Sequence, residues 1–276
     1  MSDETLAASL APDAFFDLTD FAHRALFDGK QYVWEAIAVI GEYIDGFFAG
    51  LTIDDGILGD VEDGVVIRGE RIAVAPGAVI EAGAQIRGRD IVIAEGAVIE
   101  AGAYIKGEKV YIGPGALVER AWLKGQRIIV DRKAKVLVNT RLRDNVIIGE
   151  EAEAGFAADI KNAVFLPRAA AAHFVYAGDS LVGRRVNLAD KTTLSNLRHD
   201  GRAPKVRVGG ETLDSGLRKF GAVVGDDVRT GCVTTLNPGT LVGRGVWTYD
   251  HTVLSGVVAA HQIVKHRQTN EATERR

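Results

Sequence analysis

The sequence predicts an all-β solenoid, specifically a left-handed parallel β-helix. The first observation is a spacing: apolar residues recur at every sixth position, a period that fits neither an α-helix nor an ordinary strand. The second is composition, since glycine is abundant at 32 of 276 residues while tryptophan is scarce at 3. Three six-residue sides close one coil with the periodic residue pointing inward, and glycine suits the corners between sides.

The period of six runs through most of the chain in two blocks. It begins as Val74, Ile80, Ile86, Ile93, Ile99, Ile105, Ile112 and Val118, and continues as Lys124, Val130, Val136, Leu142, Ile148, Ala154, Ile160, Leu166, Ala172, Val182, Leu188 and Leu194. It resumes as Val224, Thr230, Leu236, Val242, Thr248 and Leu254. The steps from Ile86 to Ile93 and from Ile105 to Ile112 hold one extra residue, which predicts bulges at the same corner. We expect Lys124 to reach solvent or to mark a distorted coil.

The pattern divides the chain into four parts. Residues 1–50 are expected to form a helical hairpin after a disordered start at 1–11, because apolar residues follow helical spacing over 13–27 and again over 31–48. This hairpin is expected to cap the open edge of the solenoid or to contact a neighbouring subunit. Residues 51–70 lead in, residues 71–260 form the β-helix with a polar loop at 197–220, and residues 261–276 form a charged tail. A long loop in a regular solenoid is a candidate functional insertion.

Composition excludes several classes of protein. The single cysteine, Cys232, allows neither an intrachain disulfide framework nor a cysteine-based metal site. Because the chain has no signal-peptide pattern and no apolar run long enough to cross a bilayer, we expect a cytoplasmic protein without membrane insertion. The formal net charge of -4 argues against nucleic-acid binding. Residues 161–219 nevertheless hold 11 Lys and Arg against 5 Asp and Glu, which suits a small anionic substrate.

A longer motif inside the repeat resembles a known family. The run H-F-x-Y-x-G-D-S-L-V-G-x-x-V-N-L begins at His173, S-N-L-R-H-D-G begins at Ser195, and S-G-L-R-K-F-G-A-V-V-G begins at Ser215. Over residues 71–258 the chain resembles the acyltransferase domain of the bifunctional glucosamine-1-phosphate acetyltransferase/N-acetylglucosamine-1-phosphate uridylyltransferase family, in its sugar-1-phosphate nucleotidylyltransferase/acetyltransferase branch. Those relatives carry a nucleotidylyltransferase domain before the β-helix. About fifty residues are too few for such a domain, so we expect no nucleotidylyltransferase activity.

The resemblance implies a homotrimer that transfers acetyl from acetyl-CoA to the amine of a hexosamine-1-phosphate. His173 matches the general base, a role that suits an imidazole, and Asn196 matches the residue near the acetyl group and amine. The matching acceptor-binding residues are Arg143, Lys161, Tyr176 and Asn187. The acyl-CoA side, by position, involves Asp190, Leu197, Cys232 and Asp250. Attack is expected to be direct, because the sequence offers no nucleophile paired with a base.

Two other functions stay open. Relatives carry Gly-Ala-Gly where this chain reads Ala189-Asp190-Lys191, so a degenerate trimer that binds a sugar nucleotide, or that acts as a scaffold for a separate nucleotidylyltransferase, is the alternative. The same fold also occurs in zinc enzymes with two histidines five apart, as His261 and His266 are. No suitable third histidine is in phase with them, so we expect no metal.

Overall fold

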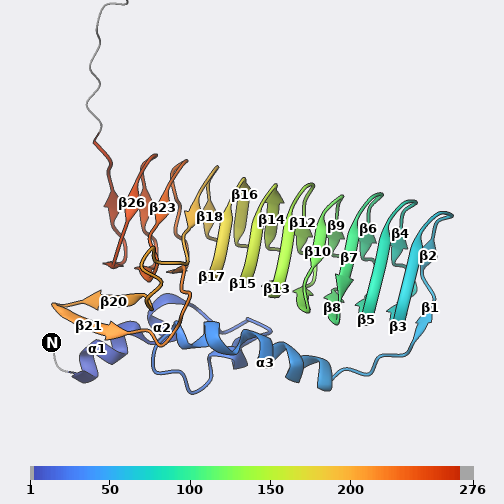
Figure 1. Cartoon of the computed structure of the whole chain (residues 1–276), viewed down its shortest axis with the longest axis horizontal. Coiled ribbons are helices and arrows are strands. Elements are labelled where there is room, and N and C mark those ends of the chain that lie inside the picture. Colours follow the sequence, from blue (N-terminus) through green and yellow to red (C-terminus); the bar gives the residue numbers. More distant parts are fainter. Residues whose placement is uncertain (1–2, 268–276) are drawn as a thin grey trace, which may run out of the picture.

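A computed structural model describes residues 3–267. The predicted left-handed parallel β-helix is confirmed: successive coils stack in register along one axis (Figure 1). The long sheet follows two sides of each coil, and its main path is β1 (Gly56–Ile57), β3 (Val66–Val74), β5 (Gln85–Ile93), β7 (Tyr104–Gly107), β10 (Trp122–Lys124), β13 (Arg141–Ile148), β15 (Asp159–Phe165), β17 (Tyr176–Val182), β19 (Thr193–Leu194), β23 (Thr235–Leu236) and β26 (Val253–Leu254). Beside that path the long sheet holds β8 (Lys109–Ile112), β11 (Arg127–Val130), β22 (Ala222–Val224), β24 (Thr240–Val242) and β27 (Val257–Val258).

The third side of the coils forms a separate short sheet. Its strands are β2 (Asp60–Val61), β4 (Val79–Ile80), β6 (Val98–Ile99), β9 (Leu117–Val118), β12 (Lys135–Val136), β14 (Glu153–Phe156), β16 (Ala170–His173) and β18 (Asn187–Leu188), and β25 (Trp247–Thr248) pairs with β28 (Ile263–Val264) further along. The first coil therefore begins inside the segment predicted as a lead-in at 51–70. Of the predicted tail, residues 268–276 lie outside the described residues.

One inward residue from each side fills the interior of the coils, as the period of six predicts. The core contains the apolar residues of both blocks, and in the C-terminal coils threonines take inward positions and pair with one another, as Thr234 and Thr248 do at 3.1 Å. At three repeat positions the preceding residue points inward. Lys124 is exposed, as expected, and Leu123 takes the inward place. The predicted inward positions of Leu166 and Ala172 are wrong, because Phe165 and Ala171 point inward there. The corner lengths change at these coils, so the phase slips by one residue.

The predicted bulges do stack at one corner. Gly88 lies opposite Gly107 in the next coil and Gly69 in the preceding one. A Cβ on Gly69 or Gly88 would overlap the carbonyl group of the next glycine, and both have positive φ. Glycine is therefore required there by the close approach of the backbones.

The N-terminal region differs from the predicted helical hairpin. Residues 3–10, expected to be disordered, form α1 (Asp3–Leu10), and the predicted helix over 13–27 is replaced by α2 (Pro12–Phe15), turns and the 3-10 helix η1 (Arg24–Phe27). Only α3 (Glu35–Ala49) matches a predicted helix. The aromatic residues of the 13–27 stretch and Leu26 are buried, whereas its alanines are exposed. A segment buried on several sides does not need the single apolar face of a surface helix.

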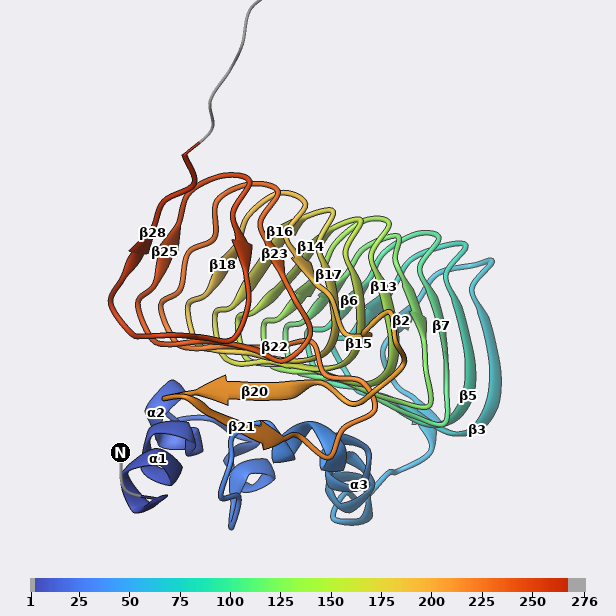
Figure 2. The ribbon, with the colours of Figure 1, turned by 60° about the vertical axis from the view of Figure 1, so that its left-hand side comes forward.

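These helices cover a long side of the solenoid and do not cap its open end (Figure 2). A second core joins α3 residues such as Ile40 and Ile44 to outward residues of the long sheet, including Ile147, Val164 and Leu181. At the far end of α3, Asp45 accepts hydrogen bonds from Lys109 and from Arg127, whose Nε–Oδ1 and Nη2–Oδ2 distances are both 2.8 Å.

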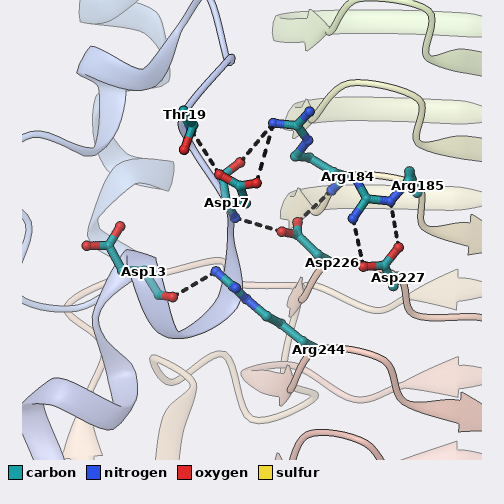
Figure 3. A network of polar contacts seen from close by, with 8 residues as sticks. All are labelled: Asp13, Asp17, Thr19, Arg184, Arg185, Asp226, Asp227 and Arg244. Carbon is teal, nitrogen blue, oxygen red and sulfur yellow. Dashed lines mark hydrogen bonds and ion pairs between the residues drawn. The ribbon is translucent and has the colours of Figure 1, made fainter.

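Polar contacts fix the segment after α2 to three coil corners (Figure 3). The carboxylate of Asp226 accepts hydrogen bonds from the backbone N–H groups of Asp17 and Arg184, both at 2.7 Å. Arg244 donates to the carbonyl of Asp13 at 2.8 Å. The N-terminal region is therefore part of one packed body with the solenoid.

The polar loop predicted at 197–220 is an ordered insertion. It holds an antiparallel hairpin of β20 (Lys205–Val208) and β21 (Glu211–Asp214), which lies along the same side of the solenoid as the helices (Figure 2). The backbone N–H of Phe220 donates to the carbonyl of Asn196 at 3.0 Å, so the two ends of the insertion meet. Phe220 is buried and its ring lies 6.2 Å from that of Trp34.

Candidate acyltransferase site

Four predicted site residues share one corner of the solenoid in successive coils. Backbone hydrogen bonds link the coils at this corner: Lys191 donates to the carbonyl of His173 at 2.9 Å, Val233 to Asp190 and His251 to Cys232 at 2.8 Å each. In each coil the next residue has positive φ, which turns the chain. We call these four residues the corner column: His173, Asp190, Cys232 and Asp250.

His173 stands at the N-terminal end of the corner column and is exposed. Beside it Phe174 is 51% exposed, packs edge-on against Phe156 at 5.1 Å between ring centroids, and carries the ammonium of Lys191 6.0 Å above its ring. Within residues 3–267 the His173 side chain has no hydrogen bond or ion pair. Its ring nitrogens are accessible to a ligand.

A second group of predicted residues lies at the start of the long-sheet strands, next to the corner column. Arg143 pairs in register with Lys161, and Lys161 with Gly178. Arg143 is held by Asp159, with Nε–Oδ1 at 2.8 Å and Nη2–Oδ2 at 3.0 Å. Its guanidinium is therefore already paired, whereas Lys161 has no carboxylate within 4.0 Å in the described chain.

Tyr176 and Asn196 converge over Gly178. A Cβ on Gly178 would lie 2.6 Å from the Tyr176 hydroxyl oxygen and 2.5 Å from Asn196 Nδ2, so the two polar groups occupy the space of the missing side chain. Burial raises the pKa of Tyr176, and the nearby Arg143 guanidinium opposes that shift. Tyr176 therefore remains a neutral hydrogen-bond donor near neutral pH.

Asn196 is supported by a ladder of two amide side chains and one carboxylate. The three residues of this ladder were not among the predicted site residues. Asn145 Nδ2 donates to Asn162 Oδ1 at 3.3 Å, and Asn162 Nδ2 donates to Asp179 Oδ1 at 2.9 Å. Asn196 Nδ2 then donates to Asp179 Oδ2 at 2.5 Å. Asn145, Asn162 and Asp179 have positive φ; they lie two residues after Arg143, one after Lys161 and one after Gly178. Asparagine and aspartate tolerate that conformation, which is the signal that the sequence contained.

A cavity of about 610 Å³ lies beside this ladder, between α3 and the insertion. Lys161 and Asp179 line it from the solenoid, and Arg218 and Lys219 line it from the insertion. These two cations were not among the predicted site residues.

Two predicted residues stand apart from these groups. Asn187 begins β18 on the short sheet, where it pairs with Ala170 and bridges Arg229. Leu197 is 45% exposed at the start of the insertion. The fold therefore places the corner column and the Arg143, Lys161, Tyr176 and Asn196 group on neighbouring parts of the solenoid, and Asn187 on its short sheet.

Among residues 3–267, no three His, Cys, Asp or Glu side chains gather where they would hold a metal ion. No helix in that part of the chain has the length and apolar character needed to span a bilayer.

The chain is similar in sequence to bifunctional enzymes. It is 34% identical over 127 residues to the bifunctional sugar-1-phosphate nucleotidylyltransferase/acetyltransferase of Sulfurisphaera tokodaii, which covers 46% of this chain and 32% of that protein. It is 32% identical over 127 residues to the bifunctional protein GlmU of Methanococcus aeolicus, covering 46% of this chain and 31% of that protein. The chain thus matches about a third of the length of these relatives.

Other comparisons are weaker. No protein-family model matches the chain. A solved structure of an Arabidopsis UDP-N-acetylglucosamine acyltransferase is 13% identical, with 78% of this chain and 71% of that chain covered and a TM-score of 0.33. The resemblance predicted from the His173 and Ser195 motifs is confirmed by the sequence matches: over the matched residues, this chain is related to the bifunctional sugar-1-phosphate nucleotidylyltransferase/acetyltransferases.

Proposed function

We propose that this protein is an acyltransferase that moves acetyl from acetyl-CoA to the amine of a hexosamine-1-phosphate. The observation that carries the proposal is the position of His173. It heads the corner column and comes three residues before Tyr176, which lies with Lys161 and Asn196 on the neighbouring strands. A base, a cation for a phosphate and neutral hydrogen-bond donors are the parts that acyl transfer to an amino sugar phosphate needs.

In the proposed reaction the acceptor nitrogen attacks the thioester carbonyl carbon, and the nitrogen–carbon bond forms as the carbon–sulfur bond breaks. His173 takes the proton that the amine loses, and this proton then neutralises the departing thiolate of CoA. Asn196 and Tyr176 orient the reacting groups or donate to the oxyanion. In this direct transfer no covalent acyl-enzyme forms.

The acceptor phosphate is assigned to Lys161. Its ammonium lines the cavity beside the amide ladder, together with Arg218 and Lys219. Arg143 remains the second candidate cation for this phosphate, as the resemblance implies, with two of its donors already used by Asp159. Arg143 contributes its remaining N–H groups and its field near Tyr176.

We also infer a homotrimer whose sites lie between subunits. Large apolar side chains are exposed beside the corner column, namely Phe174 at 51%, Val233 at 38% and Val253 at 66%. Exposed apolar side chains on a solenoid favour association with another copy. In such an assembly a neighbouring subunit supplies the wall that His173 lacks in one protomer, and Asn187 contacts the acceptor from there.

The proposal is tested by release of free thiol from acetyl-CoA. The purified protein is given glucosamine-1-phosphate, galactosamine-1-phosphate or unphosphorylated glucosamine, with light scattering to follow its assembly. Release that depends on a phosphorylated amino sugar supports the proposal. A trimer that releases no thiol with any acceptor contradicts it and favours the sugar-nucleotide-binding or scaffold alternative.

A further inference from the structure

The insertion builds a second cationic cavity that the proposed reaction has not used. It has a volume of about 430 Å³ and is lined by Arg198, Arg202, Lys205 and Arg207 of the insertion. Its other wall is formed by two neighbouring coil corners, at Asn237 and Ser255.

The cations are held in place by the fold of the hairpin. Val206 is fully buried in the second core, and because side chains alternate along a strand, Lys205 and Arg207 both point away from it. The hairpin lies directly against the coils: a Cβ on Gly239 would be 3.4 Å from the carbonyl oxygen of Lys205. The hydroxyl of Ser215 donates to the carbonyl of Pro204 at 2.6 Å and closes the base of the hairpin.

Most of the charge in this cavity is not neutralised. Arg198 is paired with Asp200, with Nε–Oδ1 at 2.9 Å and Nη2–Oδ2 at 2.6 Å. The side-chain nitrogens of Arg202, Lys205 and Arg207 form no ion pair within 4.0 Å among residues 3–267, and Arg202 contacts Asp200 through its backbone N–H at 3.1 Å. Three like charges around one concavity repel each other, and a multiply charged anion relieves that repulsion.

The cavity lies on the same face as the proposed reaction centre. Tyr176 pairs with Thr193, Thr193 with Thr235, and Thr235 with Val253. Asn237 and Ser255 come two residues after Thr235 and Val253, so their corners lie one and two coils beyond that of Asn196. Since neighbouring strands are about 4.8 Å apart, the cavity begins within about 5–10 Å of Asn196 along the solenoid axis.

The corner column is a poor site for phosphate in comparison. Two of its members beyond His173, Asp190 and Asp250, are carboxylates, and Asp250 accepts a hydrogen bond from the backbone N–H of Cys232 at 2.7 Å. Asp190 is ion-paired with Lys191, with Oδ2 and Nζ 3.1 Å apart, so Asp250 is the carboxylate that repels the three phosphate groups of CoA at this corner. The cations of the insertion, Arg202, Lys205 and Arg207, attract these phosphate groups.

We propose that Arg202, Lys205 and Arg207 bind the phosphate groups of the acyl-CoA donor, while its acyl-bearing arm runs along the threonine row to Asn196. This assignment rests on the proposed function and adds a donor site made by the insertion. The phosphate of the acceptor stays at Lys161, on the other side of the reaction centre.

The test is calorimetric titration of coenzyme A, and separately of glucosamine-1-phosphate, into three forms of the full chain. The forms are the wild type, the double variant Lys205→Ala/Arg207→Ala, and the control Lys133→Ala/Lys135→Ala, which removes two exposed charges from another corner. Charge-assisted hydrogen bonds contribute about 1.5–3 kcal/mol each. We therefore expect at least a roughly tenfold rise in the Kd for coenzyme A in the double variant only, an unchanged Kd for glucosamine-1-phosphate, and a wild-type affinity that falls with added salt.

Each other outcome overturns the assignment. Equal affinity of all three forms for coenzyme A, or no binding by the wild type, removes the donor site. Weakened binding of glucosamine-1-phosphate alone would show that the cavity holds the acceptor. Thiol release is measured on the same samples. If the wild type released no thiol but the double variant still lost coenzyme A binding, the proposed function would be wrong and the coenzyme A site would stand. Both altered side chains are exposed, and matching thermal unfolding curves check that the variants fold.

Discussion

Asn196 donates its side-chain amide to Oδ2 of Asp179 across one coil, at an N–O distance of 2.5 Å. Both residues are nearly buried, at 8% and 7% exposed. The bond fixes the Asn196 side chain beside Tyr176 before any ligand arrives. Preorganised donors of this kind stabilise a transition state without reorganisation during the reaction.

Replacing Asp179 therefore tests a positioning role. In Asp179→Ala, Asn196 and Asn162 both lose their acceptor, and we expect kcat to fall by about 10²-fold, the loss typical of one oriented polar group. The KM for acetyl-CoA should stay near the wild-type value, because Asp179 faces the acceptor cavity. A KM rise without a loss in kcat would contradict the role. Asp179→Asn, which keeps one acceptor oxygen, should recover part of the rate.

Gly178→Ala tests whether Tyr176 and Asn196 need the space between them. The added Cβ would lie 2.5 Å from Asn196 Nδ2, so the side chains must move apart, whereas the backbone has no positive φ to strain. We expect at least a roughly tenfold loss in kcat/KM from a displacement of this size, with little change in Tm. Gly46→Ala in α3 is the control, since a Cβ there meets no atom within 4 Å. Full activity in Gly178→Ala would show that the reaction does not need the close placement of Tyr176 and Asn196.

Lys161→Ala should raise the KM for the hexosamine-1-phosphate by about tenfold, as expected for loss of a hydrogen bond to a charged group. Lys124 is the matched control because it occupies the same row one coil before Arg143 and is exposed. Steady-state kinetics on both variants decide the point. If the acceptor KM rose equally in Lys124→Ala, the loss of any nearby positive charge would explain the rise, and Lys161 would not be the phosphate ligand.

The ion pairs of Asp45 predict a pH dependence of stability. Hydrogen bonds from Arg127, and from Lys109, lower the pKa of Asp45 from 3.8 to about 2 against the effect of desolvation. Because the folded pKa lies below the unfolded one, this stabilisation is complete above pH 3.8 and disappears as pH falls through about 2. The carboxylate is 35% exposed, so we expect Asp45→Asn to cost only about 1 kcal/mol at pH 7.

Urea unfolding from pH 7 down to pH 2 checks this expectation. The wild type and Asp45→Asn should differ at pH 7 and converge toward pH 2. A difference that is constant over this range would mean that Asp45 acts through packing of α3 and not through its charge.

The sequence predicted the solenoid well because each inward position repeats one local requirement, a small or medium apolar residue at every sixth place. It does not predict that Phe165 points inward in place of Leu166, because a corner that loses a residue shifts the phase without any change in composition. The apolar spacing of the 13–27 stretch fits a helix. The second core instead buries Phe16, Phe21 and Leu26 from several directions, and that packing depends on partners more than a hundred residues away.

For the site, the motif around His173 identified residues that the fold brings to one corner, including Asp190 and Cys232. The pairing of Arg143 with Asp159 depends on the register between two coils, and the spacing of apolar residues does not predict which polar side chains meet across that register. The cations at Arg218 and Lys205 belong to an insertion outside the repeat. Their place beside the coils follows from buried contacts of Val206 and Phe220 that have no periodic signal.

The central claim is that His173 is the base of an acyl transfer, and thiol release by His173→Ala tests it most directly. His266→Ala is the control, since His266 is exposed and lies outside the candidate site. With acetyl-CoA and glucosamine-1-phosphate, we expect the control to match the wild type and His173→Ala to keep its assembly and Tm while kcat falls by about 10²–10⁴-fold. Wild-type turnover in His173→Ala would contradict the account.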